Sequence, residues 1–279
     1  MKKYFKNFNI LKRFNSLAEN INTKIANSRI NNFRSVIIIY AVIFSIFLFL
    51  SIPGLFNYEK YKEEIKKVFI NDFNMFVSIE GDIEYRFVPS PHIILKTTDI
   101  NLNSNENSNI GKIENVKLFI SLYELYKNKK IEVKKLQIKN GNFYFKNRIF
   151  PFFNNHLEKA VIKPIEISSS NFFYINNNDE VATISPINKI DYYIDLKTKE
   201  KKFKLSGNIF DINFNFLWKK NYNSPSTTVS ELAFKNPNLR IKHKKTKNGN
   251  NYLGNLEFNF LRRNGYLNYI YEENILKVK

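Results

Sequence analysis

The stretch GDIEYRFVPSPHIIL, Gly81 to Leu95, alternates apolar and charged side chains. Ile83, Tyr85 and Phe87 are apolar, and an acid or a base precedes each of them. Successive side chains of a strand point to opposite faces, and the alternation already begins at Ile79. This period of two predicts one β-strand over Ile79–Phe87, with one wet face and one apolar face. Pro-Ser-Pro stops the pattern, and His92 begins another apolar run.

The same period recurs to the end of the chain, and about a dozen short strands can be counted. Only Val116–Tyr126, VKLFISLYELY, reads as a helix in the middle of the chain. The other alternating segments are Ile165–Ile167, Tyr192–Leu196, Phe203–Leu205, Ile212–Phe216, Leu256–Phe260 and a final strand at Ile275–Val278.

Three places interrupt the alternation. Ile131–Val133 alternates with charge, and Leu136–Ile138 resumes one register later, which predicts a β-bulge. Asn140-Gly141 predicts a hairpin turn before the next strand. Ser168–Ser170 is a polar run that also predicts a turn.

A long apolar segment precedes all of these strands. No charged residue occurs between Arg34 and Glu59, and Val36–Ile52 reads VIIIYAVIFSIFLFLSI. With its uncharged flanks the segment reaches the roughly 20 residues that a membrane-spanning helix needs, which predicts an anchor over residues 35–56. A cleaved signal peptide is the rival interpretation. The 34-residue leader and the lack of a small-x-small site after Ile52 disfavour it.

The charges beside this segment predict its orientation. Residues 1–34 carry eight Lys or Arg and one acid, whereas residues 59–75 carry four bases and four acids. The positive-inside rule then leaves a basic leader, residues 1–34, in the cytoplasm. It sends residues 57–279 across the membrane, which in a bacterium means an inner-membrane anchor and a periplasmic domain.

Tyr58–Asn71, YEKYKEEIKKVFIN, predicts a short amphipathic helix after the anchor. Its apolar side chains lie on one face, with Lys and Glu opposite. This helix could rest on the bilayer surface or pack on the domain that follows.

Composition and motifs argue against several functions. The formal net charge is +19, but the lysines are scattered and the predicted topology disfavours nucleic acid as a partner. The chain has no cysteine, and His92, His156 and His243 have no companion at metal-binding spacing. No nucleophile elbow or phosphate-binding loop occurs. We therefore expect no enzyme, no metal and no cofactor.

The sequence thus predicts a mainly β protein with few helices, in which an N-terminal transmembrane helix precedes an elongated, twisted antiparallel β-sheet groove. The alternative is a closed β-sandwich or jelly roll, because periodicity does not say whether the apolar faces meet or stay open.

The order of these parts resembles the AsmA family of envelope proteins. The resemblance rests on VSIEGDIEYRFVPSPHIIL (Val77 to Leu95), DINLNSN (Asp99 to Asn105) and ENVKLFISLYELYKNKKIEVKKLQIKNGNFYF (Glu114 to Phe145). It covers roughly residues 30–150, and FKLSGNIF (Phe203 to Phe210) extends it weakly. The chain departs from the family in size, since many members are far longer.

The resemblance implies a membrane-anchored β-rich protein that binds or relays phospholipid in outer-membrane biogenesis. Its partners would be the membrane, phospholipid and other envelope proteins. The rival function is a bitopic scaffold that assembles envelope proteins without transferring lipid. The residues that we expect to line a lipid groove are Ile79, Ile83, Tyr85, Phe87, Ile131, Val133, Phe143, Phe145, Leu205, Ile212, Phe214, Phe216, Leu256 and Phe258.

Overall fold

The computed structural model of the 279-residue chain describes residues 33–101, 109–146, 163–221, 226–272 and 275–278. The chain divides into two compact units, Met1–Pro53 and Gly54–Lys279. Most of the predicted basic leader, residues 1–34, lies outside the described residues. Its cytoplasmic location, like the three-part division of the chain, stays a prediction.

The helical elements are short, apart from the first one. Their bounds are α2 Phe33–Ser51, η1 Ile52–Leu55, η2 Tyr58–Tyr61, α3 Lys62–Phe73 and α4 Leu122–Asn128. The first eight strands are β1 Phe76–Ile79, β2 Ile83–Arg86, β3 His92–Asn101, β4 Asn109–Ile120, β5 Val133–Lys139, β6 Asn142–Lys146, β7 Ile165–Ile175 and β8 Val181–Asp195. The others are β9 Glu200–Ile209, β10 Ile212–Asn221, β11 Thr227–Phe234, β12 Leu239–Asn248, β13 Asn251–Phe260, β14 Arg263–Glu272 and β15 Ile275–Val278.

Helix α2 supports the predicted anchor. Val36–Leu55 forms a span of 20 residues that is long and apolar enough to cross a membrane, and it is the one such span among the described residues. Isoleucine, phenylalanine and leucine occur on every side of it, and their side chains are exposed. A helix that is apolar all round needs an apolar environment, and lipid supplies one.

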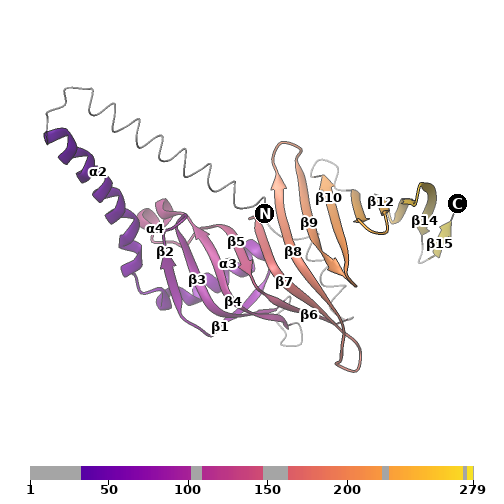
Figure 1. The fold of residues 1–279 in the computed structure, drawn as a ribbon, viewed down its shortest axis with the longest axis horizontal. Coiled ribbons are helices and arrows are strands. Elements are labelled where there is room, and N and C mark those ends of the chain that lie inside the picture. The colour runs from indigo at the N-terminus through magenta and orange to yellow at the C-terminus, as the bar shows by residue number, and fades with distance from the viewer. Residues whose placement is uncertain (1–32, 102–108, 147–162, 222–225, 273–274, 279) are drawn as a thin grey trace. The chain divides into compact units, whose positions relative to one another are not determined.

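All fifteen strands belong to one open sheet (Figure 1). From β7 to β15 each strand pairs antiparallel with the next along the chain, whereas β5 and β6 pair parallel with β7. The predicted β-rich open sheet is confirmed. The closed sandwich or jelly roll is wrong, because the strands do not divide into two facing sheets.

The apolar side chains of the sheet share one face, although single strands change phase. In β3 the core cluster takes Ile93 and Leu95 and then Ile100, with Thr98 buried two residues before it, whereas His92 and Ile94 are buried outside that cluster. The shift falls where Glu80 and Gly81 both donate their backbone N–H to the carbonyl of Thr97, at 3.0 and 3.4 Å. Two residues thus face one, which is a β-bulge in the segment between β1 and β2, and β3 changes phase at the same place.

That bulge also corrects the interpretation of Ile79–Phe87 as one strand. The segment forms two strands, β1 and β2, which are separated at Glu80–Asp82 and both pair with β3. Phe87 follows the last residue of β2. The alternation of side chains along the sequence shows no sign of this break, because Gly81 and Asp82 keep the spacing that one continuous strand would also have.

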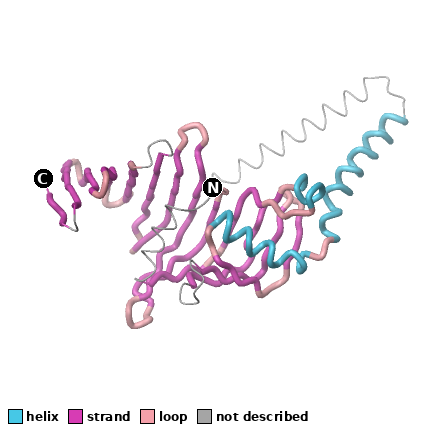
Figure 2. Tube along the Cα trace, turned by 180° about the vertical axis from the view of Figure 1, so that it is seen from behind, coloured by secondary structure: helices cyan, strands magenta, loops and turns pink. Residues whose placement is uncertain are grey.

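Helix α3 covers the apolar face over the first strands, as the view from behind shows (Figure 2). Ile65, Phe69 and Phe73 are fully buried there, in one cluster with β-strand residues such as Leu95 and Leu118. The helix ends at Asn74, whose left-handed backbone, φ 50°, lets its N–H donate to the carbonyls of the last turn. The predicted amphipathic helix therefore packs on the sheet rather than on a bilayer.

The predicted central helix Val116–Tyr126 is wrong for its first half. Val116, Leu118 and Ile120 are buried strand residues of β4, and the helix α4 begins at Leu122. A short apolar run satisfies both periods, so sequence alone cannot separate a strand that enters a helix from one longer helix.

The predicted bulge between Val133 and Leu136 is confirmed, because the β4–β5 register shifts there. The hairpin turn at Asn140-Gly141 is wrong. β5 and β6 run in the same direction along β7, and the Gly141 N–H donates to the side chain of Ser170 at 3.0 Å. Ser168–Ser170 is accordingly no turn but part of β7, with a positive φ of 50° at Ser169 that matches the kink.

Gly111 in β4 marks the closest approach of β4 to β6. A Cβ atom at this position would lie 2.3 Å from the backbone carbonyl oxygen of Asn142. We expect Gly111→Ala to lower the free energy of unfolding by about 1–3 kcal/mol, because backbone cannot move aside as a side chain does. Urea unfolding of the full chain measures this loss. Glu114→Ala, an exposed change in the same strand, is the control, and equal losses would contradict the prediction.

Candidate functional site

A single apolar row crosses the sheet from β5 to β13. Strand register places one side chain of each strand in it, and every one of them is apolar. At a strand spacing of ~4.8 Å the row is about 34 Å long. This central apolar row consists of Ile138, Ile167, Ile190, Leu205, Phe216, Leu232, Ile241 and Phe258.

A second row lies two residues further along each strand. It begins with Tyr192, Phe203 and Trp218 and continues with Ser230, His243 and Leu256. Trp218, which is the only tryptophan of the chain, is half-buried. We call these residues the Trp218 row. On the other side of the central apolar row, Phe214 and Phe234 pair with each other and extend the apolar face.

The apolar face changes from buried to exposed along the sheet. Its members in the first strands are sealed beneath α3, and Ile190 is still only 3% exposed. Leu205 and Phe216 are half-buried at the edge of the core cluster. Phe258 is 42% exposed, so the face meets solvent over the last strands. Apolar area left in water is unfavourable, and a row of this kind marks a surface that binds an apolar partner.

The structure places the predicted groove residues in three groups. Ile79, Ile131, Val133 and Phe143 are at most 4% exposed and form the closed core, so no ligand reaches them without rearrangement. The second group lies on the half-buried or exposed part of the apolar face. It consists of Phe145, Leu205, Ile212, Phe214, Phe216, Leu256 and Phe258.

The three remaining predicted residues lie in β2 or directly after it. Ile83 packs against the core, and Tyr85 stacks on Tyr58 with ring centroids 6.2 Å apart. Burial raises the pKa of Tyr85 to about 12. Phe87 is half-buried beyond the end of β2. These side chains belong to the covered end of the sheet.

Sequence reasoning missed several members of the rows. Ile190, Leu232 and Ile241 occupy the central apolar row, and Trp218 occupies the row beside it. The segment INFNFLW carried the signal for Trp218, because Ile212, Phe214, Phe216 and Trp218 continue one period. Leu232 and Ile241 can be assigned to the row only from the pairing register of β11 and β12, which the sequence alone does not give.

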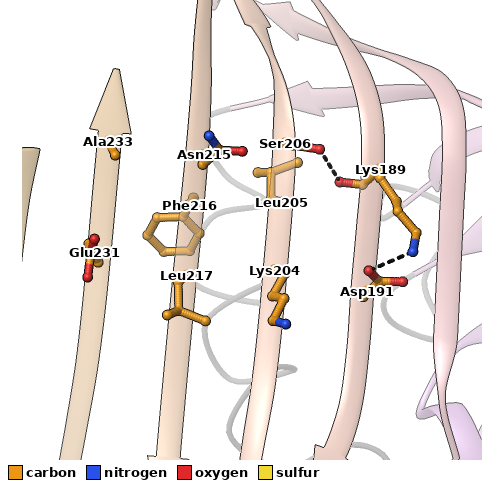
Figure 3. A pocket seen from close by; sticks show the side chains of 10 residues that line it. All are labelled: Lys189, Asp191, Lys204, Leu205, Ser206, Asn215, Phe216, Leu217, Glu231 and Ala233. Atoms are coloured by element: carbon orange, nitrogen blue, oxygen red, sulfur yellow. Dashed lines mark hydrogen bonds and ion pairs between the residues drawn. The ribbon is translucent and has the colours of Figure 1, made fainter. Parts of the chain in front are cut away.

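The opposite face of the same strands is polar and carries a hollow of about 290 Å³ (Figure 3). Lys189 and Asp191, two residues apart on β8, form an ion pair at 3.0 Å in its lining, and the side chain of Asn215 also lines it. A second hollow of about 330 Å³ lies between Lys244 and Tyr269 on β12–β14. The lining of the first hollow includes Leu205 and Phe216 of the central apolar row, and that of the second includes Leu253 and Ile270, so both hollows have apolar as well as polar walls.

Ion pairs order the strand ends on that polar face. Lys202 donates to Asp195 at 2.7 Å and contacts Glu200 at 3.2 Å. The lysine, together with the backbone N–H groups of Thr198 and Lys197, lowers the pKa of Asp195 to about 2. This network closes the turn between β8 and β9 and leaves its acids ionised at neutral pH.

Within the described ranges no three His, Asp or Glu side chains lie close enough to hold an ion. The Nε2 atom of His243 lies 2.7 Å from the hydroxyl of Tyr269, and the two rings stack. Burial, and then the charge of Lys245, lower the pKa of His243, which favours its neutral form.

Comparison with known proteins supports the resemblance seen in the sequence. Residues 33–146 match the model of the AsmA family. The matched segment runs from α2 to β6, so it includes the candidate membrane span, α3 and most of the buried core. No curated protein matches the chain in sequence. The exposed part of the apolar face, on β9–β14, lies beyond the matched segment.

Proposed function

We propose that this chain, AsmA-type over residues 33–146, is a single-pass membrane protein that binds phospholipid on the apolar face of its sheet and relays it in outer-membrane biogenesis. The observation that most supports this proposal is the central apolar row, which is unbroken over eight strands and becomes exposed toward β13. Acyl chains suit such a surface because each buried CH₂ contributes about 0.8 kcal/mol.

The anchor and its flanking charges support a location for this function. α2 is a candidate membrane span, and the excess of bases before it favours a cytoplasmic N-terminus. The sheet would then lie in the periplasm, with the anchor in the inner membrane. The domain is no enzyme and needs no cofactor in this proposal. Its partners are the membrane, phospholipid and other envelope proteins, and nucleic acid is not among them.

The scaffold function loses its main support. It rested on a closed, dry β domain, whereas the sheet is open and its apolar side chains are exposed on the last strands. The size of the sheet limits the lipid function as well. A row of about 34 Å can hold a lipid or pass it on, but it is too short to span an envelope alone.

Trp218 provides the test, because it is the only tryptophan and lies one row from the central apolar row. Full-length protein in detergent is titrated with phospholipid that carries bromine on its acyl chains, since bromine quenches indole fluorescence on contact. We expect saturable quenching by the lipid. A brominated detergent at matched acyl-chain concentration is the control. Quenching that is no stronger with lipid than with detergent would contradict the proposal.

A further inference from the structure

A row of lysines borders the apolar face. Strand register aligns Lys201 on β9, Lys220 on β10 and Lys245 on β12, with Thr228 of β11 between the last two. These residues lie on the same face as Trp218, two residues further along each strand. At a strand spacing of ~4.8 Å this lysine row extends over about 15 Å. It is the first row on this side of the central apolar row that carries charge on neighbouring strands.

The charges of the lysine row are close together. Lys201 and Lys220 are directly opposite each other on paired strands, an arrangement that destabilises a sheet when both carry the same charge. Burial lowers the pKa of Lys201, and the charge of Lys220 lowers it further. An anion placed between these ammonium groups would relieve the repulsion.

Several lysines of the polar face are paired with acids. There Lys202 pairs with two acids, Lys189 with Asp191, and Lys242 with Glu257. Among the residues that the structure describes, neither Lys220 nor Lys245 forms an ion pair; the ammonium of Lys245 lies 4.0 Å from the ring centroid of Tyr252. Among the described residues, Lys204, Lys219 and Lys244 of the polar face form no ion pair either. The lysine row is therefore distinguished by its half-buried position beside the apolar face and by the direct apposition of Lys201 and Lys220.

We propose that the lysine row binds the phosphate of an anionic phospholipid whose acyl chains lie across the Trp218 row and the central apolar row. The inference rests on the proposed function and adds an orientation and a headgroup class to it. From the lysine row to the central apolar row is four residues along a strand, or about 13 Å. A lipid lying this way puts its charged end on ammonium groups and its chains on aromatic and aliphatic side chains.

The first test removes the charges. In Lys201→Gln/Lys220→Gln/Lys245→Gln the three lysines of the row become neutral. The matched control is Lys204→Gln/Lys219→Gln/Lys244→Gln, which removes the same charge from the polar face of the same three strands. Binding of brominated phosphatidylglycerol to the full-length protein is followed by quenching of Trp218. We expect the row variant to bind about tenfold more weakly or worse, and the control to bind like the parent.

The same titration with brominated phosphatidylcholine separates headgroup charge from chain binding. This zwitterionic lipid should bind the parent more weakly than phosphatidylglycerol, and the row variant should have lost most of that preference. Equal weakening in the row variant and its control would overturn the proposal, because it would point to net charge alone. Thermal unfolding of both variants, followed by circular dichroism, shows whether each retains the fold on which the comparison depends.

The second test measures the orientation of the bound lipid and uses only the protein without substitutions. Trp218 is two residues, about 7 Å, from the lysine row along β10. Phospholipid brominated near the glycerol end of its chains should therefore quench Trp218 more strongly than phospholipid brominated near the methyl end. The reverse order, or equal quenching, would overturn the orientation and leave lipid binding intact. Absence of quenching by either lipid would overturn both this inference and the proposed function.

Discussion

Replacing Phe69 by alanine is expected to lower the free energy of unfolding by about 3–5 kcal/mol. Phe69 is 0% exposed and lies in α3 between Ile65 and Phe73, which are also fully buried. Its ring lies 5.8 Å from that of Phe73, and both rings belong to the cluster formed with the first strands of the sheet. Truncation removes the apolar contacts and leaves a cavity between a helix and a sheet that meet along one narrow seam.

Urea unfolding of the full-length protein, followed by circular dichroism, measures the loss. Lys67→Ala is the matched control, because Lys67 is exposed on the same helix and should change the free energy of unfolding by less than about 0.5 kcal/mol. If Phe69→Ala shifted the urea midpoint no further than Lys67→Ala, then α3 would not be part of the core. The apolar face would in that case be open from β1 onward.

The sequence was informative about local pattern and much less so about long-range pairing. Alternation identified most strands, and the bulge between Val133 and Leu136 followed from a one-residue phase change. Local signals failed where a distant strand decided the outcome. Asn140-Gly141 has the composition of a hairpin turn, yet β7 takes both β5 and β6 as parallel neighbours. A turn signal fixes the backbone conformation of a few residues and cannot say which strand pairs beyond it.

The candidate site shows the same limit. Period two placed the apolar residues on one face, and that face is continuous in the structure. It could not tell that Val133 and Phe143 are sealed in the core while Phe258 is exposed, because burial depends on where α3 packs. The lysine row was hidden for a similar reason. Lys201, Lys220 and Lys245 are scattered in the sequence and come together only through the register of four strands.

Placing an acid in the central apolar row is expected to abolish lipid binding. Phe216 is half-buried where the row leaves the core cluster, and Phe258 is its counterpart at the exposed end of the row. In Phe216→Asp a bound acyl chain would have to desolvate a carboxylate, which is strongly unfavourable without a partner. The variant should bind brominated phospholipid at least about a hundredfold more weakly, since it loses an aromatic contact and gains a buried charge.

Matched changes on the opposite face separate this effect from folding and from charge. Asn215→Asp adds the same charge one residue away on β10 but on the polar face, and it should bind lipid like the parent. Phe258→Asp tests the length of the site, because the side chain is 42% exposed and its replacement disturbs the core little. If lipid covers the whole row, both aspartates on the apolar face weaken quenching of Trp218 and Asn215→Asp does not. If Phe258→Asp binds like the parent while Phe216→Asp fails, the lipid occupies only the strands around β10. Quenching that survives Phe216→Asp unchanged would mean that the central apolar row does not contact the lipid.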